Sequence, residues 1–237
     1  MPGAWLILPT YNERENLEPL VRAALPRLEA SGLPYTVLVV DDGSPDGTGR
    51  IAEGLAAELD RVRVLHRDRK EGLGRAYLAG FAVALEEGAD LVLEMDSDFS
   101  HDTADLPRLI AAARAADLVL GSRYVPGGGV EDWGLVRRTL SYGGCLYARV
   151  LLGVPVRDLT GGFKCFNRRV LETIDLRGVH ADGYGFQIEL TYRAVKAGFT
   201  VAEVPIRFRE RRRGTSKMNA RIALEAVWKV PALRLRG

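Results

Sequence analysis

Residues 35–44 read YTVLVVDDGS, a run of six β-favouring residues that ends in two aspartates, a glycine and a serine. A short apolar run bounded by such turn-forming residues is typical of a buried strand. Similar apolar runs are found at 4–8, 62–65, 90–95 and 117–120. They alternate with amphipathic stretches at 15–29, 46–59, 72–86 and 105–116. This alternation predicts an α/β fold with a mostly parallel central sheet flanked by helices.

The regular alternation ends after Gly121. A glycine-rich stretch at 126–129 is followed by a helical pattern at 135–151, and further predicted elements are a helix near 185–196, a strand at 200–204 and a last helix from Ala220. We expect a single domain over 1–237, in which residues 1–121 and 122–206 share one sheet and residues 207–237 form a tail.

The net charge of +2 conceals an uneven distribution. From Arg207 onward there are ten Lys or Arg residues and two acids, a net charge of +8, so the first 206 residues carry −6. A hydrophobic fraction of 47% and a charged fraction of 27% are ordinary for a globular protein and exclude a disordered or collagenous chain. No apolar run reaches the roughly 18–20 residues that span a bilayer, and no signal peptide is recognised, so we expect a cytoplasmic protein. Cys145 and Cys165 are expected to be buried, reduced thiols.

Polar side chains follow three of the predicted strands. These segments are Pro9-Thr10-Tyr11-Asn12-Glu13, Asp41-Asp42-Gly43-Ser44 and Asp96-Ser97-Asp98. Ligands of open parallel sheets bind at the carboxyl ends of the strands, so we expect these side chains to line one site. Because neighbouring carboxylates repel one another, they need a cation or strong hydrogen-bond donors. The D-x-D pattern suits Mg²⁺ or Mn²⁺, and the alternative for this pattern alone is a capped turn.

A dinucleotide-binding domain would require G-x-G-x-x-G directly after the first strand. The first strand here runs into Leu-Pro-Thr-Tyr-Asn instead. The pair Gly72 and Gly74 follows the third strand, and Tyr77 stands where the last glycine would be. The sequence therefore argues against a dehydrogenase.

Four motifs resemble the family 2 inverting glycosyltransferases of GT-A fold: Leu8-Pro9-Thr10-Tyr11-Asn12-Glu13, Val39-Val40-Asp41-Asp42-Gly43-Ser44, Asp96-Ser97-Asp98 and Gly121-Ser122-Arg123-Tyr124. Further motifs resemble the polyprenol-phosphate (dolichol-phosphate) mannose synthases within it: Gly72-Leu73-Gly74, Asp158-Leu159-Thr160-Gly161-Gly162-Phe163, Gly185-Phe186-Gln187 and Arg211-x-x-Gly214-x-Ser216-Lys217. The resemblance covers nearly the whole chain in order. It implies a GT-A-type nucleotide-sugar-binding fold with a nucleotide-binding half (1–121), an acceptor half (122–206) and a basic loop with a C-terminal amphipathic helix (207–237).

The resemblance also implies roles for individual residues on the donor side. Those expected to bind the guanine, ribose and phosphates of GDP-mannose are Pro9, Tyr11, Glu13, Asp41, Asp96, Ser97, Arg211 and Lys217. Asp98 would ligate Mg²⁺ or Mn²⁺ at the diphosphate. Ser100 stands where the family often has glutamine, so a shorter hydroxyl ligand is expected there, either directly or through a water. Arg211 and Lys217 would close over the bound donor, whereas the alternative for the charged run at 211–213 is an ordinary solvated surface.

Three residues match the positions that bind the acceptor phosphate in such synthases: Arg123, Arg137 and Ser141. Arg137 and Ser141 are four residues apart on one predicted helix, and therefore share a face. A guanidinium binds phosphate bidentately. The alternative for any single arginine here is a solvated helix face, for which Arg138 is the best candidate. Asp98, Arg123 and Arg137 are the expected catalytic residues.

The implied reaction is a metal-dependent, inverting transfer of mannose from GDP-mannose to polyprenyl or dolichyl monophosphate. A phosphomonoester has a second pKa of about 6 and arrives as an anion, so it needs positive charge more than a catalytic base. Asp158 and Glu189 are accordingly expected to be structural, Asp158 as a turn residue or arginine partner and Glu189 on the helix after Gly185.

Other hypotheses stay open at this point. The nucleotide sugar could be a UDP-sugar, with transfer of glucose or N-acetylhexosamine, and a non-catalytic sensor or membrane adaptor is the alternative from another class. A nucleic-acid partner is not expected, since the tail lacks interleaved aromatic residues. The last helix, with Ala223, Leu224, Val227 and Trp228 beside Lys229, Arg234 and Arg236, could either lie peripherally on the cytoplasmic membrane face or pack on the domain. A separate membrane-anchoring protein is a further candidate partner.

Overall fold

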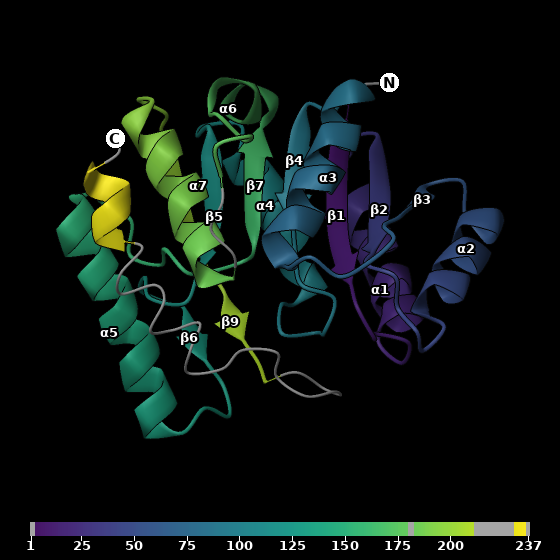
Figure 1. The fold of residues 1–237 in the computed structure, drawn as a ribbon, viewed down its shortest axis with the longest axis horizontal. Helices are drawn as coiled ribbons and strands as arrows, with labels where there is room; N and C mark the ends of the chain where they lie inside the picture. The colour runs from purple at the N-terminus through teal and green to yellow at the C-terminus, as the bar shows by residue number, and fades with distance from the viewer. Residues whose placement is uncertain (1–2, 180–182, 211–229, 236–237) are drawn as a thin grey trace.

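The computed structural model describes residues 3–179, 183–210 and 230–235. Seven strands form one sheet in the order β3-β2-β1-β4-β7-β5-β8 (Figure 1). They are β1 (Ala4–Thr10), β2 (Tyr35–Asp41), β3 (Val62–His66), β4 (Leu91–Glu94), β5 (Leu118–Ser122), β7 (Lys164–Asn167) and β8 (Val201–Pro205). In this sheet β7 runs antiparallel to its neighbours β4 and β5, and the other neighbouring strands pair in parallel. The expected α/β fold with a mostly parallel sheet is confirmed.

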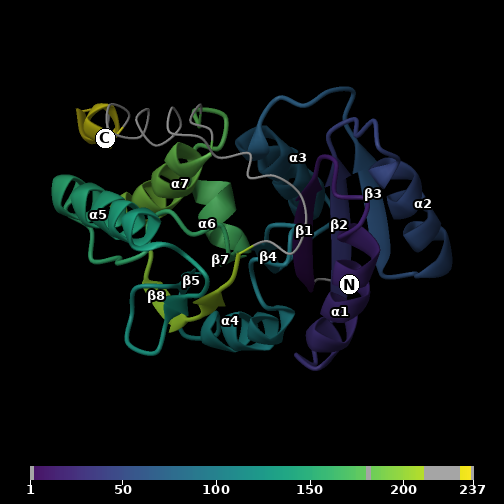
Figure 2. The same ribbon diagram turned by 90° about the horizontal axis from the view of Figure 1, so that it is seen from below.

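Helices cover both faces of this sheet (Figure 2). One face is covered by α1 (Leu17–Glu29), α2 (Thr48–Glu58) and α4 (Leu106–Ala112). The opposite face is covered by α3 (Leu73–Glu86), α5 (Leu135–Leu152), α6 (Arg168–Thr173) and α7 (Tyr184–Lys196). A 3-10 turn, η1 (Thr103–Asp105), precedes α4, and β6 (Gly129–Val130) pairs with β9 (Arg207–Phe208) in a small second sheet.

Strand β1 shows how the sheet divides the core. Its residues alternate between the two faces, as the pleat requires. Trp5 and Ile7 join the core under α3, whereas Leu6 and Leu8 join the core under α1. All four side chains are at most 4% exposed. β1 is therefore a central strand, and its carboxyl end opens between those of β2 and β4.

The predicted strands and helices of 1–121 and the later helices at 135–151 and 185–196 are all present, with shifts of a few residues at their ends. Strands from both halves of the chain share one sheet, as expected. Strand β7 and helix α6 were not predicted. The reason is visible in β7, where Lys164 is fully buried in a strand of only four residues and interrupts the apolar pattern.

Cys145 and Cys165 are buried free thiols, as predicted. None of the helices in the described ranges combines the length and the apolarity needed to cross a bilayer.

The chain end is described only over residues 230–235, which are helical. Val230 is buried and Leu233 packs against the core under α3, while Arg234 donates a hydrogen bond to the carbonyl oxygen of Leu151 in α5. This part of the predicted C-terminal helix therefore packs on the domain. The rest of that helix, and the predicted donor residues Arg211 and Lys217, lie outside the described residues.

Candidate functional site

A cavity of about 300 Å³ opens at the carboxyl ends of the central strands. Residues at or just after the carboxyl ends of β1, β2 and β4 line it, namely Pro9, Thr10, Tyr11, Glu13, Asp42, Asp96, Ser97 and Asp98. The three strand ends meet because β1 is hydrogen-bonded to both β2 and β4. The convergence of these segments, expected from the sequence, is therefore present.

Asp41 and Asp42 lie differently with respect to this cavity. Asp41 is 3% exposed and does not line it, and its carboxylate accepts hydrogen bonds from the backbone amide and the hydroxyl of Ser44, at 3.1 and 2.6 Å. Asp42 lines the cavity and pairs with Arg67. Burial raises the pKa of Asp42 even though the charge of Arg67 opposes this. The predicted contact of Asp41 with a ribose stays a prediction.

A strained turn brings Asp98 and Ser100 together. Phe99 between them has φ 62°, in the left-handed region that bulky residues rarely adopt. Asp98 Oδ1 accepts a hydrogen bond from the Ser100 amide at 3.0 Å. The Ser100 hydroxyl is buried and has no hydrogen-bond partner among the residues that the structure describes. Within those residues, no group of three or more His, Cys, Asp or Glu side chains could hold a metal ion by itself.

His101 also lines the cavity, although the sequence analysis assigned it no role. Its ring lies 5.0 Å from that of Phe163 and 5.1 Å from that of Phe208, and neither ring nitrogen has a hydrogen-bond partner within the described ranges. Burial lowers the pKa of His101 to about 4, so the imidazole is neutral at physiological pH. Its position three residues after Asp98 was the available sequence signal.

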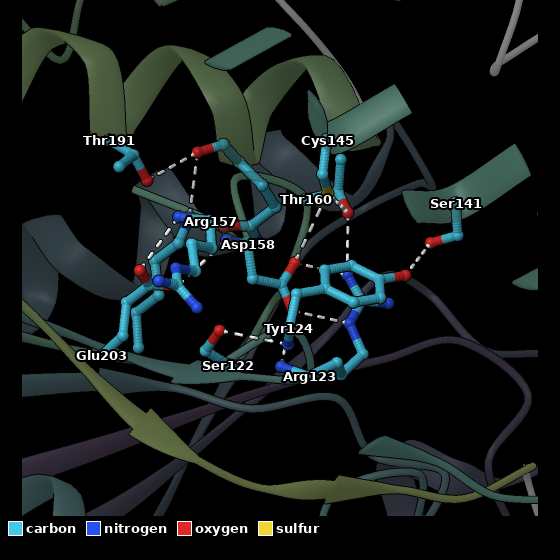
Figure 3. Close-up of polar contacts among 12 residues, drawn as sticks. Ser122, Arg123, Tyr124, Ser141, Cys145, Arg157, Asp158, Thr160, Thr191 and Glu203 are labelled. Atoms are coloured by element: carbon cyan, nitrogen blue, oxygen red, sulfur yellow. Dashed lines mark hydrogen bonds and ion pairs between the residues drawn. The ribbon is translucent and has the colours of Figure 1, made fainter. Parts of the chain in front are cut away.

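Arg123 is held rigidly at the cavity wall (Figure 3). Its Nε and Nη2 donate to the two carboxylate oxygens of Asp158, at 2.7 and 2.6 Å, and Nη2 also donates to the Thr160 hydroxyl at 2.7 Å. Burial opposes ionisation of Asp158, but the charge and hydrogen bonds of Arg123 hold the pKa of its carboxyl below the ordinary value. The interpretation of Asp158 as an arginine partner is confirmed.

Arg137 reaches the same cavity from the first turn of α5. Its guanidinium lies 4.1 Å from the ring centroid of Trp133, and its Nη1 pairs with Glu210 Oε1 at 2.8 Å. Ser141, one turn later, does not line the cavity and accepts a hydrogen bond from the Tyr124 hydroxyl at 2.7 Å (Figure 3). The structure thus brings Arg123 and Arg137 to the cavity and leaves Ser141 beside it.

A buried polar network supports another cavity residue that the sequence analysis missed. Gln187 of α7 lines the cavity, donates to Glu94 Oε2 at 3.3 Å and accepts hydrogen bonds from the Lys164 ammonium. Lys164 and Glu94 are fully buried and lie 3.6 Å apart. Burial raises the pKa of Glu94 to about 7 and lowers that of Lys164. The motif Gly185-Phe186-Gln187 was the sequence signal for this position.

Two further charged residues near the site are Glu189, which was predicted to be structural, and Lys70, which was not predicted. Glu189 of α7 pairs with Arg193 at 2.6 Å, in keeping with a structural role. Lys70 lines the cavity with its ammonium 4.5 Å from the ring centroid of Tyr11, and it was not predicted because the nearby motif Gly72-Leu73-Gly74 does not include it.

Comparison with known proteins gives three consistent likenesses. Residues 5–175 match the family described as Glycosyl transferase family 2. The chain is 51% identical to the polyprenol monophosphomannose synthase of Mycolicibacterium smegmatis, over 98% of this chain and 87% of that protein. It is 49% identical to the undecaprenyl-phosphate mannosyltransferase of Micrococcus luteus, over 93% of this chain and 89% of that protein.

The fold also matches solved structures. Glucosyl-3-phosphoglycerate synthase from Mycobacterium tuberculosis, solved with Mn²⁺, UDP and glucosyl-3-phosphoglycerate, superposes with a TM-score of 0.72 at 20% identity, over 98% of this chain and 80% of that one. At this level of identity the likeness concerns the fold alone, and it confirms the GT-A-type architecture expected from the sequence motifs.

Proposed function

The chain belongs to glycosyl transferase family 2 and is a glycosyltransferase, and on this premise we propose that it transfers mannose from GDP-mannose to the phosphate of a polyprenyl monophosphate, with inversion at the anomeric carbon. Two relatives of about half identical sequence support this acceptor and this sugar, since their names specify mannose and a polyprenyl phosphate or polyprenol. GDP as the nucleotide rests on the sequence motifs.

The observation that carries the proposal is the division of charge within one cavity. Carboxylates enter from the ends of β1, β2 and β4, whereas Arg123 follows β5, two strands along the sheet from β4, and Arg137 enters from α5. A transfer between a nucleotide sugar and a phosphomonoester brings two phosphate-bearing reactants together. The arginine side suits the acceptor phosphate, and the carboxylate side suits sugar and ribose hydroxyls or a cation.

The two arginines would act differently on the acceptor. Nε and Nη2 of Arg123 are engaged by Asp158 and Thr160, and Asp158 neutralises its charge, so Arg123 would mainly orient the phosphate through Nη1. Arg137 would supply the net positive charge. Its pairing with Glu210 is exposed on both sides, at 45% and 51%, so exchanging Glu210 for a phosphate would cost little. Because the acceptor is already an anion, no base is required.

A divalent cation, Mg²⁺ or Mn²⁺, fits the residues at the turn after β4. The carboxylate of Asp98 and the hydroxyl of Ser100, which has no hydrogen-bond partner in the described part of the chain, are hard oxygen donors two residues apart. Mg²⁺ and Mn²⁺ are commonly held by one or two protein oxygens, with phosphate oxygens and water completing the shell. When bound, such a cation neutralises negative charge on the departing diphosphate. Arg211 and Lys217 are proposed to assist the donor.

The proposed acceptor is a membrane lipid. The chain would therefore work at a bilayer surface, peripherally and on the cytoplasmic face, and a separate anchoring protein is a candidate partner.

A substrate panel tests the proposal. Purified protein is incubated with a short polyprenyl phosphate in detergent and with radiolabelled GDP-mannose, UDP-glucose or UDP-N-acetylglucosamine, with and without Mn²⁺ or Mg²⁺. We expect metal-dependent transfer from GDP-mannose. Transfer from a UDP-sugar alone would show that the donor is that UDP-sugar and not GDP-mannose. Binding of GDP without turnover would favour the non-catalytic adaptor.

Two variants test the assigned residues. Asp98→Asn should abolish transfer without unfolding the protein, and full activity would refute the metal role. Arg137→Ala should raise the KM for the lipid phosphate about tenfold or more, while that for the nucleotide sugar changes little, because a charge-assisted contact is lost. Arg138→Ala, one residue away and not lining the cavity, is the matched control. Equal increases in both KM values would indicate that Arg137 acts on the donor side of the cavity.

A further inference from the structure

Three polar side chains are buried side by side next to the cavity. Glu94 of β4 and Lys164 of β7 stand directly opposite each other in the antiparallel pair, and Gln187 of α7 is hydrogen-bonded to both. Glu94 and Lys164 are fully buried, and Gln187 is 2% exposed. Burial of such groups costs free energy even when they are paired, and apolar side chains of similar size often give equal or greater stability. Stability alone therefore does not account for these three residues.

Lys164 and Glu94 fix which way the side-chain amide of Gln187 points. The Lys164 ammonium has hydrogen-bond donors only, and it donates to Oε1 of Gln187 and, at 2.9 Å, to the Gln187 carbonyl oxygen. Glu94 Oε2 accepts a hydrogen bond from Nε2 of Gln187 at 3.3 Å. Reversal of the amide would set Nε2 against the ammonium and Oε1 against the carboxylate, so that both contacts would become repulsive. The amide nitrogen is therefore held in one place.

Gly162 shows where this nitrogen lies with respect to the cavity. Gln187, Gly162 and Asp96 line the cavity, whereas Lys164 and Glu94 do not. A Cβ at Gly162 would be 3.4 Å from Gln187 Nε2 and 3.6 Å from each carboxylate oxygen of Asp96. Because glycine has no side chain, the cavity wall at this point has a space with an N–H donor and a carboxylate acceptor beside it.

This space suits a hydroxyl group, which both donates and accepts hydrogen bonds. Among the described residues, Nε2 of Gln187 donates to Glu94 alone, which leaves its second N–H for a ligand. Asp96 accepts a hydrogen bond from the Tyr77 hydroxyl at 3.3 Å, and a carboxylate has lone pairs for further donors. One ligand hydroxyl beside Gly162 can therefore accept from Gln187 and donate to Asp96.

The sheet order indicates which part of a substrate would occupy the space. Asp96 follows β4 and Gly162 precedes β7, and these two strands lie between β1 and β5 in the sheet. The space is therefore located between the strand ends proposed to bind the nucleotide and Arg123, which follows β5 and is proposed to bind the acceptor phosphate. A sugar that passes from one reactant to the other has to lie between them.

We propose that Gln187 is a specificity-determining residue whose Nε2 donates a hydrogen bond to one hydroxyl of the transferred hexose, and that Lys164 and Glu94 are positioning residues that hold the amide for this contact. The inference rests on the proposed function, because it takes the donor to be a nucleotide-activated hexose. It assigns to a buried ion pair, which does not itself reach the cavity, a role in the choice of sugar.

Binding of the donor and of its nucleotide alone tests the contact. GDP-mannose and GDP are titrated calorimetrically with Mn²⁺ present, at about pH 8, above the folded pKa of Glu94 of about 7. Gln187→Met keeps the length of the side chain and removes the donor. It should weaken binding of GDP-mannose about three- to tenfold, as expected for one hydrogen bond, and leave binding of GDP unchanged, because GDP has no hexose. Leu190→Met, the same new side chain at a buried position of α7 that does not line the cavity, is the matched control.

Deoxy donors identify the hydroxyl. Transfer to a short polyprenyl phosphate is measured from GDP-mannose and from its monodeoxy analogues, each of which lacks one hydroxyl. The unchanged chain should discriminate against one analogue by about tenfold or more in kcat/KM. Gln187→Met should lose this discrimination and treat the other analogues as the unchanged chain does.

Replacement of the ion pair tests the positioning role. Lys164→Met/Glu94→Leu substitutes apolar side chains of similar size for both charges, so stability to urea should be unchanged or higher. The amide of Gln187 can then reverse, and discrimination against the same analogue should fall at least about threefold. Lys164→Gln/Glu94→Gln, which keeps polar side chains without the charges that fix the amide, should do the same. Circular dichroism establishes that each variant is folded.

Several results would overturn the inference. Equal weakening of GDP and GDP-mannose binding in Gln187→Met, the same weakening in Leu190→Met, or undiminished discrimination in Gln187→Met would exclude the contact. Undiminished discrimination in both double variants would show that the ion pair is only structural. Absence of transfer from GDP-mannose by the unchanged chain would instead defeat the proposed function. The same measurements, made with the UDP-sugar that is transferred and its deoxy analogues, would then still decide this inference.

Discussion

Helices α3 and α5 pack on the same face of the sheet and both begin beside the cavity, yet they direct their large apolar side chains in opposite directions. Tyr77 and Phe81 of α3 are fully buried. The buried residues of α5 are Cys145, Ala148 and Leu152, and Leu151 is partly buried against the core, but seven other large apolar residues of this helix are exposed. Amphipathic periodicity therefore identifies an apolar face without specifying what covers it.

Position in the fold explains the difference. Helix α3 lies over the centre of the sheet, where Phe81 packs against Phe166 with ring centroids 5.7 Å apart and against Tyr77 at 6.0 Å (Figure 2). Helix α5 lies at one end of the molecule, and among the described residues its buried side chains are Cys145, Ala148 and Leu152. The following predictions test whether side chains of α3 and α5 also differ in how much they contribute to the free energy of unfolding.

The largest difference is expected for truncation of a large side chain. Phe81→Ala should lower the free energy of unfolding by about 3–5 kcal/mol, because it leaves a cavity in the core. Leu140→Ala on α5 should change it by no more than about 0.5 kcal/mol, since the side chain is already exposed. Urea denaturation measures both. Similar losses in the two variants would mean that α5 is covered in solution.

A second contrast concerns charges. Glu94 is fully buried near α3 and α7, and its folded pKa of about 7 exceeds the ordinary 4.5. The folded state therefore holds this proton more tightly, so the stabilisation is complete below pH 4.5 and is lost as the pH rises through 7. The free energy of unfolding should fall across this range by up to about 3 kcal/mol from this group.

Glu94→Gln removes the titrating group. The free energy of unfolding of this variant should therefore change less with pH between 4.5 and 7, as measured by urea denaturation at several pH values. Arg138→Gln, an exposed charge on α5, is the control and should keep the slope of the unchanged chain. An unaltered slope in Glu94→Gln would show that Glu94 does not titrate there.

The smallest effects, and opposite signs, are expected for two helical glycines. An alanine at Gly80 of α3 would place its Cβ in steric overlap with Ile7 Cγ2, so Gly80→Ala should destabilise the fold by about 1–3 kcal/mol. At Gly143 of α5, such a Cβ would meet no described atom within 4 Å outside the helix's own backbone. Gly143→Ala should therefore stabilise by about 0.5–1 kcal/mol through helix propensity. Thermal denaturation would detect both shifts, and destabilisation by Gly143→Ala would contradict an open α5 surface.

Much of the candidate site could be predicted from the sequence. Of the proposed site residues, those that line the cavity are Pro9, Tyr11, Glu13, Asp96, Ser97, Asp98, Arg123 and Arg137. They could be predicted because strand ends and short motifs are local signals. Asp41, Ser100 and Ser141 do not line the cavity: Asp41 accepts hydrogen bonds from Ser44, Ser141 accepts one from Tyr124, and the Ser100 hydroxyl is buried. Their roles stay predictions.

Other features depend on residues that are distant in the sequence. Lys164 interrupts an apolar strand, and its burial is understandable only because Glu94 stands directly across from it on β4. The register of an antiparallel pair between residues seventy positions apart leaves no local pattern. His101 and Lys70 were missed for a related reason, because a lone residue acquires a role only from what the fold places next to it.

The sequence by itself determined the alternation of strands and helices, the convergence of three polar strand ends and the existence of α5, because hydrophobic periodicity and strand length are properties of neighbouring residues. Only the tertiary structure decided that β7 runs antiparallel within the sheet, that Asp158 holds Arg123, and that α5 turns its apolar side outward. Burial depends on which other elements occupy the space around a helix. At the end of the domain no strand or described helix covers that side of α5.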